Sequence, residues 1–285
     1  MSEPRRLGRG EVRRLLDESG LAPVKALGQH FVVDPNTVER IARLAGVGPG
    51  DKVVEIGPGL GSLTLALAST GAQVVAVEVD GRLAAVLRTV VPASVRVVEA
   101  DARQVDWHEV LGASGPWALV ANLPYNVATT LVVEMLESVP LVARLLVMVQ
   151  REAAERFAAL PRTKAYGAVS VRIAYFATSR VVGQVSPEVF YPRPNVESAL
   201  VEIVRRPVPA VAQDVASYGE ICVLVRAGFA GRRKMLRRSL AGLVADEAFA
   251  YADIPGSARA EELDVAAWGK LAACQRSIAS ARSSS

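Results

Sequence analysis

Glycines cluster in one short stretch near the start of the chain, where they could bring the backbone close to a ligand. The stretch VVEIGPGLGSLT, residues 53–64, contains Gly57, Gly59 and Gly61 between two apolar segments. Glycine permits sharp turns and close approach of the backbone to a bound molecule at the carboxyl end of a strand. The pattern predicts a ligand-binding loop, although a strand-to-helix turn without a ligand would also explain it.

Each of the next two apolar segments ends in a carboxylate. Glu78, in VEVD, lies about twenty residues beyond the glycines, where a carboxylate can accept hydrogen bonds from both hydroxyls of a ribose. Asp101, in VVEADA, could accept a hydrogen bond from an adenine amino group, and Val79 or Ala102 could flank the ring. Together these positions predict a site for one nucleoside-like ligand.

Two kinds of ligand fit this pattern, a nicotinamide dinucleotide and S-adenosylmethionine. Nicotinamide dinucleotides contain a pyrophosphate that binds at a helix N-terminus, and their usual loop is G-x-G-x-x-G. The loop here is G-x-G-x-G, and the acidic Glu55 stands just before it. Both features favour S-adenosylmethionine, which has no phosphate, but the spacing alone leaves the dinucleotide open.

A further apolar segment ends in ANLPYN, whose polar groups could bind a methyl acceptor. The exocyclic amine of adenine is a weak nucleophile because its lone pair is delocalised into the ring. Oxygen acceptors, from the side chain of Asn122 and the backbone of Leu123 or Pro124, could localise that lone pair toward a methyl donor. Tyr125 could stack on the base. The alternative is a turn with a packed tyrosine, and a turn-stabilising hydrogen bond is the expected role of Asn126.

Short β-branched stretches alternate with amphipathic stretches up to residue 150. This alternation indicates a parallel sheet covered by helices on both faces. Strands are expected at residues 52–56, 73–79, 95–100, 117–122 and 144–150. Helices are expected at residues 9–20, 35–45, 61–70, 81–90 and 128–139, and residues 21–34 are expected to be irregular.

The pattern is looser after residue 160. Residues 169–176 fit a helix or a strand, and residues 179–186 and 196–206 fit strands at an antiparallel edge of the sheet. Beyond a proline-containing linker, helices are expected at residues 218–230, 232–244, 246–254 and 262–277. The sequence therefore predicts an α/β domain over residues 1–206, a helical domain over residues 207–278 and a disordered tail over residues 279–285.

Composition bounds the class of protein. The 285 residues are 51% hydrophobic, which is enough for one large core and one smaller one. Cys222 and Cys274 are the only cysteines, so we expect a reducing compartment, no disulfide framework and no metal site. The N-terminus has no apolar signal segment, and the apolar runs are too short to cross a bilayer. We expect a soluble, cytoplasmic monomer.

Positive charge is concentrated in RAGFAGRRKMLRRS, residues 226–239, which contains no acidic residue. A net charge of +4 is by itself weak evidence for a polyanionic partner. The clustering of cations in residues 226–239 is the stronger indication of one. The candidate phosphate contacts are Arg226, Arg232, Arg233, Lys234, Arg237 and Arg238. A solvated helix face is the alternative.

Six motifs, in their order along the chain, resemble those of the rRNA adenine-N6 dimethyltransferases. They are GQHFVVD, VEIGPGLGSLT, VEVD, ANLPYN, VFYPRPNVESALV and FAGRRKMLRRSL, and the resemblance extends from about residue 20 to residue 275. It is greatest to the branch that acts on 16S rRNA, whose loss confers kasugamycin resistance in bacteria. It implies a Rossmann-like class I methyltransferase domain, with a mostly parallel seven-stranded sheet and an antiparallel edge, and a small all-α C-terminal domain.

The resemblance also implies an activity and a set of roles. S-adenosylmethionine would be the donor, S-adenosylhomocysteine the product, and two adjacent adenines in a 3′-terminal hairpin of 16S rRNA the acceptors, during small-subunit assembly. Tyr125 and Phe190 would sandwich the target base, and the basic helix 232–238 lies where the family approaches RNA. The implied donor contacts are Gln29, His30, Val32, Gly57, Gly59, Gly61, Glu78, Val79, Asp101, Ala102 and Asn122.

Three residues depart from the family pattern. His30 stands where asparagine is usual, and a neutral imidazole can still donate or accept one hydrogen bond, so donor binding is expected with a different pH dependence. Asn195 replaces a lysine and removes a cation, whereas Arg238 replaces a common asparagine and adds one. The other histidine, His108, is expected to have no functional role.

The sequence leaves two alternatives to the 16S rRNA dimethyltransferase activity. The sister enzymes that methylate 23S rRNA and give macrolide resistance commonly have NIPY where this chain has NLPYN, and RRKMLRRSL also favours the 16S branch. A catalytically inactive RNA-binding assembly factor would have a disrupted donor pocket. The intact glycine loop, Glu78, Asp101 and Asn122 argue against that role.

Overall fold

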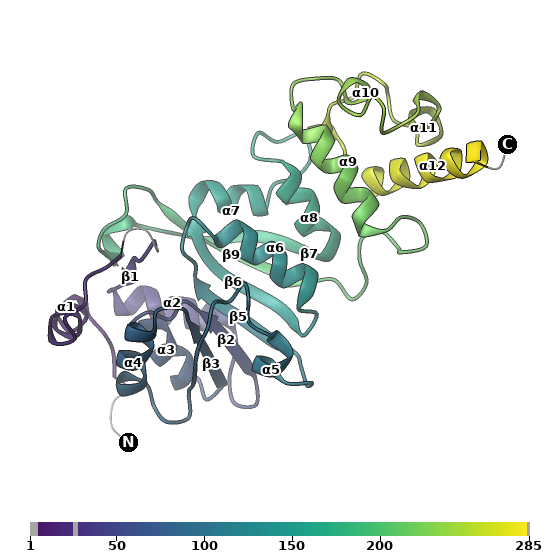
Figure 1. Cartoon of the computed structure of the whole chain (residues 1–285). Coiled ribbons are helices and arrows are strands. Elements are labelled where there is room, and N and C mark those ends of the chain that lie inside the picture. The colour runs from purple at the N-terminus through teal and green to yellow at the C-terminus, as the bar shows by residue number, and fades with distance from the viewer. Residues whose placement is uncertain (1–4, 25–27, 284–285) are drawn as a thin grey trace. The chain divides into compact units, whose positions relative to one another are not determined.

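The chain forms two compact units, seen in the computed structural model of Figure 1, which describes residues 5–24 and 28–283. The first unit contains Met1–Ala154 and Arg180–Val204, and the second contains Glu155–Ser179 and Arg205–Ser285. The boundary expected after residue 206 therefore differs for residues 155–179, which the structure groups with the C-terminal helices. Every helix in the described part of the chain is too short or too polar to cross a membrane.

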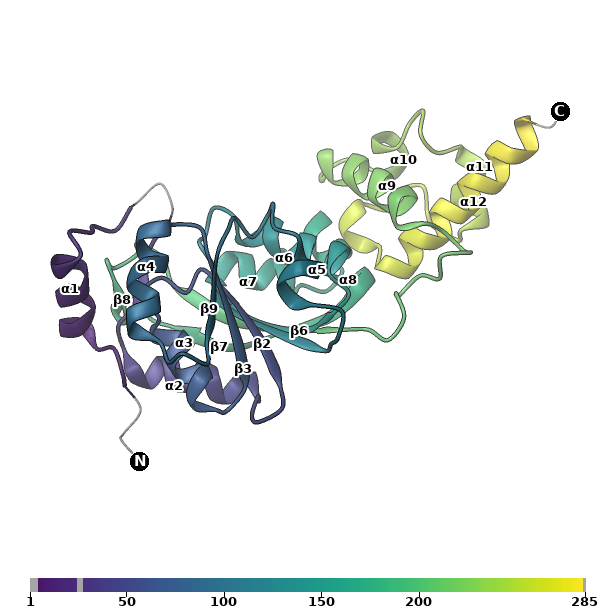
Figure 2. The ribbon, with the colours of Figure 1, turned by 60° about the horizontal axis from the view of Figure 1, so that its bottom comes forward.

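A seven-stranded sheet dominates the first unit, in the order β4-β3-β2-β5-β6-β9-β7 (Figures 1 and 2). The strands from β4 to β6 pair in parallel, and β9 runs antiparallel to β6. The predicted α/β fold with a mostly parallel sheet is confirmed, and its antiparallel strand β9 lies one place inside the edge strand β7. The bounds are β2 Lys52–Ile56, β3 Gln73–Glu78, β4 Arg96–Glu99, β5 Trp117–Asn122, β6 Val142–Gln150, β7 Ala177–Val185 and β9 Ser198–Arg205.

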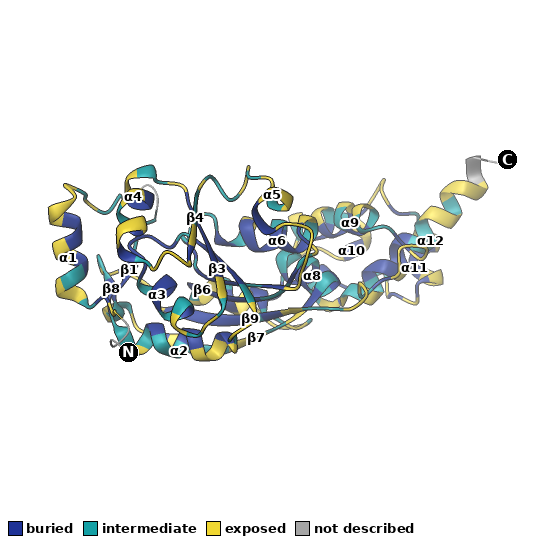
Figure 3. Ribbon diagram, turned by 90° about the horizontal axis from the view of Figure 1, so that it is seen from below, coloured by how far each residue is buried: buried dark blue, intermediate teal, exposed yellow. Residues whose placement is uncertain are grey.

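The central strands are apolar along their length because helices cover both faces of the sheet. Val53, Val54 and Leu119 are at most 1% exposed, as expected for strands buried on both sides. Helices α2 and α3 lie on one face and α5 and α6 on the other (Figures 2 and 3). The bounds are α2 Pro35–Ala45, α3 Ser62–Ser69, α4 Gly81–Val90, α5 Trp107–Leu111 and α6 Ala128–Ser138.

The predicted start of α2 is confirmed by its capping residues. Asp34 lies in an extended conformation and its carboxylate accepts a hydrogen bond from the backbone N–H of Thr37, while Pro35 occupies the first turn. Gly46 ends the helix in the left-handed region, with φ of 58°. This local chemistry determines where the helix begins and ends.

A small second sheet joins two motifs that are far apart in the chain. β1, Phe31–Val32, pairs antiparallel with β8, Phe190–Tyr191, so that Phe31 lies opposite Tyr191. The expectation of an irregular segment over residues 21–34 is wrong for β1. Helix α1, Arg9–Glu18, packs its apolar face against this region. The strand pair thus places the GQHF segment beside the segment that follows Phe190.

The second unit is helical and has its own core. The core includes Trp268, which is fully buried, and Gly228 packs so closely against it that a Cβ atom there would lie 2.6 Å from the indole ring. The helices are α8 Ala168–Phe176, α9 Tyr218–Ala230, α10 Leu236–Ser239, α11 Asp246–Tyr251 and α12 Val265–Ser283, with a short 3-10 helix at Ala260–Glu262. Helix α7, Arg151–Phe157, crosses from the first unit into the second.

The observed secondary structure of the second unit can be compared with three of the predictions made from the sequence. Residues 169–176 lie in helix α8 rather than a strand. The tail expected from residue 279 is helical through Ser283, because α12 continues there, and residues 284–285 lie outside the described part. The prediction of a basic helix over residues 232–238 is wrong. Helix α9 ends before Gly231, the chain turns, and α10 begins only at Leu236, whose side chain is buried.

Candidate functional site

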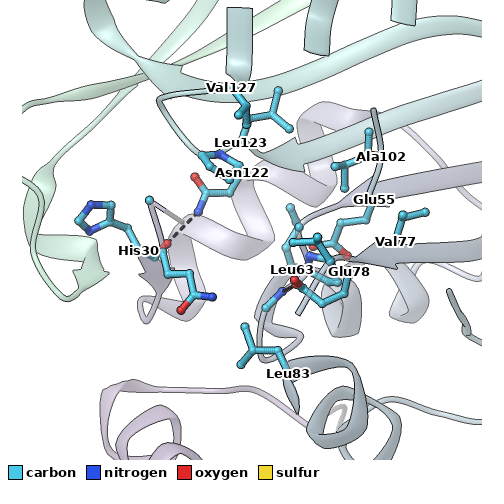
Figure 4. Close-up of a pocket in the computed structure, with 18 of the residues that line it drawn as sticks. His30, Glu55, Leu63, Val77, Glu78, Leu83, Ala102, Asn122, Leu123 and Val127 are labelled. Carbon is cyan, nitrogen blue, oxygen red and sulfur yellow. Dashed lines mark hydrogen bonds between the residues drawn. The ribbon is translucent and has the colours of Figure 1, made fainter. Parts of the chain in front are cut away.

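A pocket opens at the carboxyl ends of β2, β3, β4 and β5, and it gathers most of the residues expected to bind the donor and the acceptor (Figure 4). In parallel sheets this edge is where ligands bind, because the strand-to-helix loops converge there. The expected residues that line the pocket are Gln29, His30, Val32, Gly57, Gly59, Glu78, Val79, Asp101, Ala102, Asn122, Leu123, Pro124 and Tyr125.

The glycine loop is shaped by close packing as well as by its turn. Gly57, Gly59 and Gly61 all have positive φ, of 69°, 56° and 95°, which other residues adopt only with strain. A Cβ atom on Gly59 would lie 2.8 Å from the ring of Phe31, and one on Gly61 would lie 2.7 Å from Leu87. Gly61 does not line the pocket, so its expected donor contact is replaced by a packing role between α3 and α4.

Glu78 connects the glycine loop to the start of α4. One carboxylate oxygen accepts from the backbone N–H of Gly59 and the other from the N–H of Asp80, both at 3.0 Å. The side chain is buried, and burial raises the pKa of Glu78 above its ordinary value, partly offset by these two N–H donors. The carboxylate is therefore held rigidly at the strand end where a ribose was predicted to bind.

Glu55 is a buried acid at the floor of the pocket, visible beside Glu78 in Figure 4. It is 1% exposed, and its Oε2 has no hydrogen-bond partner within the described part of the chain. Burial raises its pKa to about 8, so the side chain is mostly neutral at neutral pH. A buried carboxyl oxygen without a partner, at the lining of a cavity, is a polar atom that a bound ligand can satisfy.

Asp101 is engaged by a residue that sequence reasoning missed. Its carboxylate accepts from the backbone N–H of Arg103 at 3.0 Å and from the guanidinium at 3.2 and 2.8 Å. The Arg103 side chain also lines the pocket and holds the pKa of Asp101 below its usual value. An adenine amino group would therefore share Asp101 with this arginine. The sequence signal for this contact was that Arg103 directly follows VVEADA, because residues two apart at a strand end can pair.

Asn122 is oriented by the chain segment that precedes β1. Its side-chain Nδ2 donates to the backbone oxygen of His30 at 2.9 Å, drawn as the dashed line in Figure 4. Because this contact identifies the amide nitrogen of Asn122, the other amide atom, Oδ1, can accept a hydrogen bond from a substrate. This orientation matches the acceptor role predicted for the Asn122 oxygen.

The predicted acceptors on Leu123 and Pro124 are not equivalent. The Pro124 carbonyl accepts from the N–H groups of Val127 and Ala128, at 3.1 and 3.0 Å, and so begins helix α6. It is directed into the helix rather than toward a substrate amine, which corrects the role expected of it. The Leu123 carbonyl is the remaining backbone candidate.

Tyr125 is held at its hydroxyl and on one face. Its hydroxyl lies 2.6 Å from Oγ of Ser198 on β9, and burial raises the pKa of the phenol. Its ring stacks against His30, with centroids 5.7 Å apart and planes at 26°. The His30 ring in Figure 4 points away from Glu55 and Glu78, although His30 lines the same pocket.

Phe190 does not lie where the resemblance implied. It is fully buried on β8, packs in the core with Val32 and Val38, and does not line the pocket. A base sandwiched between Tyr125 and Phe190 is therefore not the arrangement that this structure supports. The aromatic partner of Tyr125 is His30 instead.

The basic segment of the second unit contains two kinds of cation. Arg232 is paired, because its Nε lies 2.7 Å from Glu261 and it also donates to the Lys164 carbonyl. Arg237 lies 3.6 Å from Asp246. Within the described residues, no ion pair engages the other four expected cations, all exposed: Arg226, Arg233, Lys234 and Arg238.

The parallel sheet, the glycine loop and the carboxylates at successive strand ends define a Rossmann-like methyltransferase that uses S-adenosylmethionine. The chain belongs to the ribosomal RNA adenine dimethylase family, whose model matches residues 24–274. The ribosomal RNA small subunit methyltransferase A of Kineococcus radiotolerans is 47% identical over 274 residues, which cover 92% of this chain and 89% of the relative. The protein of that name from Cutibacterium acnes is 45% identical and covers 99% of this chain and 97% of the relative.

Solved structures agree with the fold. The 23S rRNA methyltransferase ErmE superposes with a TM-score of 0.66 and 27% identity, covering 86% of this chain and 99% of that one. A dimethyladenosine transferase from Plasmodium falciparum superposes with a TM-score of 0.72 over 85% of this chain and 96% of its own, at 22% identity, and supports the fold alone. The sequence relatives are the small-subunit enzymes, so the 23S and inactive-factor alternatives are not favoured.

Proposed function

We propose that the protein transfers methyl groups from S-adenosylmethionine to the N6 amines of two adjacent adenines in a 3′-terminal hairpin of 16S rRNA. The product would be N6,N6-dimethyladenine, formed during assembly of the small ribosomal subunit. One observation supports the proposal most strongly. The donor pocket contains Glu55, whose Oε2 has no hydrogen-bond partner among the described residues, and Asn122, whose amide nitrogen donates to the His30 backbone and so leaves the amide oxygen to accept from an amine. Relatives named small subunit methyltransferase A along nearly the whole chain support the choice of RNA.

The donor fits the residues that line the pocket. Glu78 is placed to accept from the ribose hydroxyls and Asp101 from the adenine amine, while the buried Glu55 offers a partner to the polar amino-acid end. Gly57 and Gly59 keep the loop free of side chains at the pocket wall. The donor would supply a methyl group on a positively charged sulfur.

The acceptor loop would then raise the reactivity of a weak nucleophile. Oδ1 of Asn122 and the Leu123 carbonyl accept from the two N–H bonds of the adenine amine and direct its lone pair at the methyl carbon. The N–CH₃ bond forms as the S–CH₃ bond breaks, and the acidic ammonium-like nitrogen loses its proton to solvent. Tyr125 fixes the plane of the base, so catalysis consists of positioning and electrostatics.

The exposed cations of the second unit fit an RNA backbone. Arg226, Arg233, Lys234 and Arg238 are available for phosphates, whereas Arg232 and Arg237 are engaged with acidic residues of their own unit. We propose that the small-subunit precursor in the cytoplasm is the partner and that the protein acts as a monomer. No metal is required by this chemistry.

A side-by-side methylation assay tests the choice of substrate. The protein is incubated with S-adenosylmethionine and either small-subunit particles that lack the modification or naked 23S rRNA, and dimethyladenine is mapped in each. Product in the small-subunit particles alone is expected. Product only in 23S rRNA would support the sister activity, and failure to bind S-adenosylmethionine in calorimetry would support an inactive assembly factor.

A further inference from the structure

His30 contacts the end of β5 at Asn122, the acceptor loop at Tyr125 and the segment after β8 at Pro192. The backbone oxygen of His30 holds the amide of Asn122, and its ring stacks on Tyr125. Its ring nitrogen Nδ1 lies 2.8 Å from the backbone oxygen of Pro192, just beyond β8. A carbonyl only accepts, so Nδ1 carries the hydrogen, and the ring orientation is fixed.

We infer that His30 is a positioning residue, whose ring backs Tyr125 so that the target adenine stacks on the opposite face of the tyrosine. This inference rests on the proposed function, because it concerns the acceptor base of that reaction. It replaces the sandwich between Tyr125 and Phe190 with a row of three rings, in the order His30, Tyr125, adenine.

The spacing of the two rings excludes a base between them. Stacked carbon atoms lie about 3.5–4 Å apart, so a base inserted between two rings needs roughly 7 Å between their planes. The centroids of His30 and Tyr125 are 5.7 Å apart, within the range of a direct aromatic pair. The His30 face of Tyr125 is therefore already occupied.

The remaining contacts of Tyr125 agree with this assignment. Its hydroxyl lies within hydrogen-bond distance of Ser198, which is fully buried. Gly28 brings the His30 segment close to the acceptor loop, since a Cβ atom on it would lie 3.3 Å from the Pro124 side chain. Tyr125 nevertheless lines the pocket. With one face and the hydroxyl fixed, the other face is the surface left for a base.

The test separates the ring of His30 from its hydrogen bond. His30→Ala removes both, His30→Phe keeps a ring but loses the bond to Pro192, and His30→Asn keeps a donor but has no ring. The backbone contact to Asn122 is present in all three. His108→Ala, at the exposed second histidine on α5, is the matched control.

Methyl transfer to small-subunit particles that lack the modification is measured for each variant, together with the Kd for S-adenosylmethionine by calorimetry. We expect kcat to fall about 3- to 10-fold in His30→Ala and His30→Asn, the size of one lost aromatic pair, and to recover to within about twofold in His30→Phe. The donor Kd is expected to stay within about twofold throughout, a split that misfolding would not produce.

Three outcomes would overturn the inference. Recovery by asparagine but not by phenylalanine would assign the effect to the hydrogen bond, and a weaker donor Kd in His30→Ala would assign His30 to the donor. Unchanged kcat in His30→Ala would remove any role for the ring. If the wild-type protein itself fails to methylate the particles, the proposed function fails, and the variants are not needed to show it.

Discussion

The donor side and the acceptor side of the pocket are built by different means. On the donor side, the Glu78 carboxylate is held by N–H groups 19 and 2 residues away, and the Asp101 carboxylate by Arg103, 2 residues away. On the acceptor side, Asn122 and Tyr125 are held by His30 and Ser198, which are 92 and 73 residues away. The two donor-side carboxylates are therefore held locally, whereas the acceptor side depends on contacts between distant segments of the first unit.

This difference has a consequence for function. A locally built donor site can tolerate changes in distant loops, and the same Rossmann-like scaffold can serve other acceptors. The acceptor site is assembled from the β1–β8 pair, the end of β5 and β9, so substitution of Ser198 on β9, which contacts the Tyr125 hydroxyl, should alter transfer without altering donor affinity. The predictions below are ordered from the largest expected effect to the smallest.

Asn122→Ala should cause the largest loss. It removes an oxygen that accepts in the transition state, and the loss of one such group costs about 100- to 1000-fold in kcat. Particle binding should change little, because the exposed cations of the second unit are untouched, and calorimetry measures how far the donor Kd rises, since Asn122 also lines the donor pocket. A rate near that of the wild type would show that the amide oxygen does not face the reacting amine.

Glu78→Ala should weaken the donor side without affecting RNA binding. Loss of a charged acceptor to two ribose hydroxyls, together with the freed N–H groups of Gly59 and Asp80, is expected to raise the donor Kd about 10- to 100-fold. Glu99→Ala, an exposed acid of the neighbouring strand, is the matched control. Equal donor Kd in the two variants would contradict the donor assignment.

Glu55→Gln should change the pH dependence of stability. The pKa of Glu55 is raised to about 8 by burial, so the folded state keeps the proton while the unfolded state ionises near pH 4.5. This contribution to stability is fully present below pH 4.5 and is lost as the pH rises toward 8, by about 5 kcal/mol. Urea unfolding at both ends of this window should show a flatter slope for the amide, which cannot ionise. A slope equal to that of the wild type would mean that Glu55 is ionised in the folded protein.

The two kinds of cation in the second unit should respond differently to substitution. Arg233→Glu with Arg238→Glu should weaken RNA binding and make its dependence on salt concentration less steep, because both side chains lack an acidic partner in the described part of the chain. Arg232→Gln should leave the salt dependence nearly unchanged and lower stability by at most about 1 kcal/mol, since it breaks an exposed pair. If Arg232→Gln changes the salt slope more than the double reversal does, the assignment of paired and free cations is reversed.

The donor side could be predicted from the sequence because its determinants are local. The glycines, Glu78 and Asp101 follow directly on apolar strands, and strand ends in a parallel sheet must converge. Arg103 was missed although it stands two residues after Asp101, because nothing in the apolar pattern distinguishes a pairing arginine from a solvated one.

The acceptor side could be predicted only in part, since its contacts join distant segments. No local rule shows that Pro124 gives its carbonyl to α6, that Phe190 is buried on β8, or that His30 stacks on Tyr125. Likewise Arg232 pairs with Glu261, 29 residues away in the short 3-10 helix, and Leu236, at the start of α10, is buried in the core of the second unit. These features are set by tertiary packing, which overrides propensity.

Mapping the methylated nucleotides tests the central claim most directly. The wild-type protein is incubated with S-adenosylmethionine and small-subunit particles that lack the modification, and the 16S rRNA is digested and analysed by mass spectrometry. The account predicts N6,N6-dimethyladenine at two adjacent positions of the 3′-terminal hairpin, formed by the wild type and nearly absent with Asn122→Ala. Dimethylation elsewhere in the RNA, or equal product from both proteins, would contradict it.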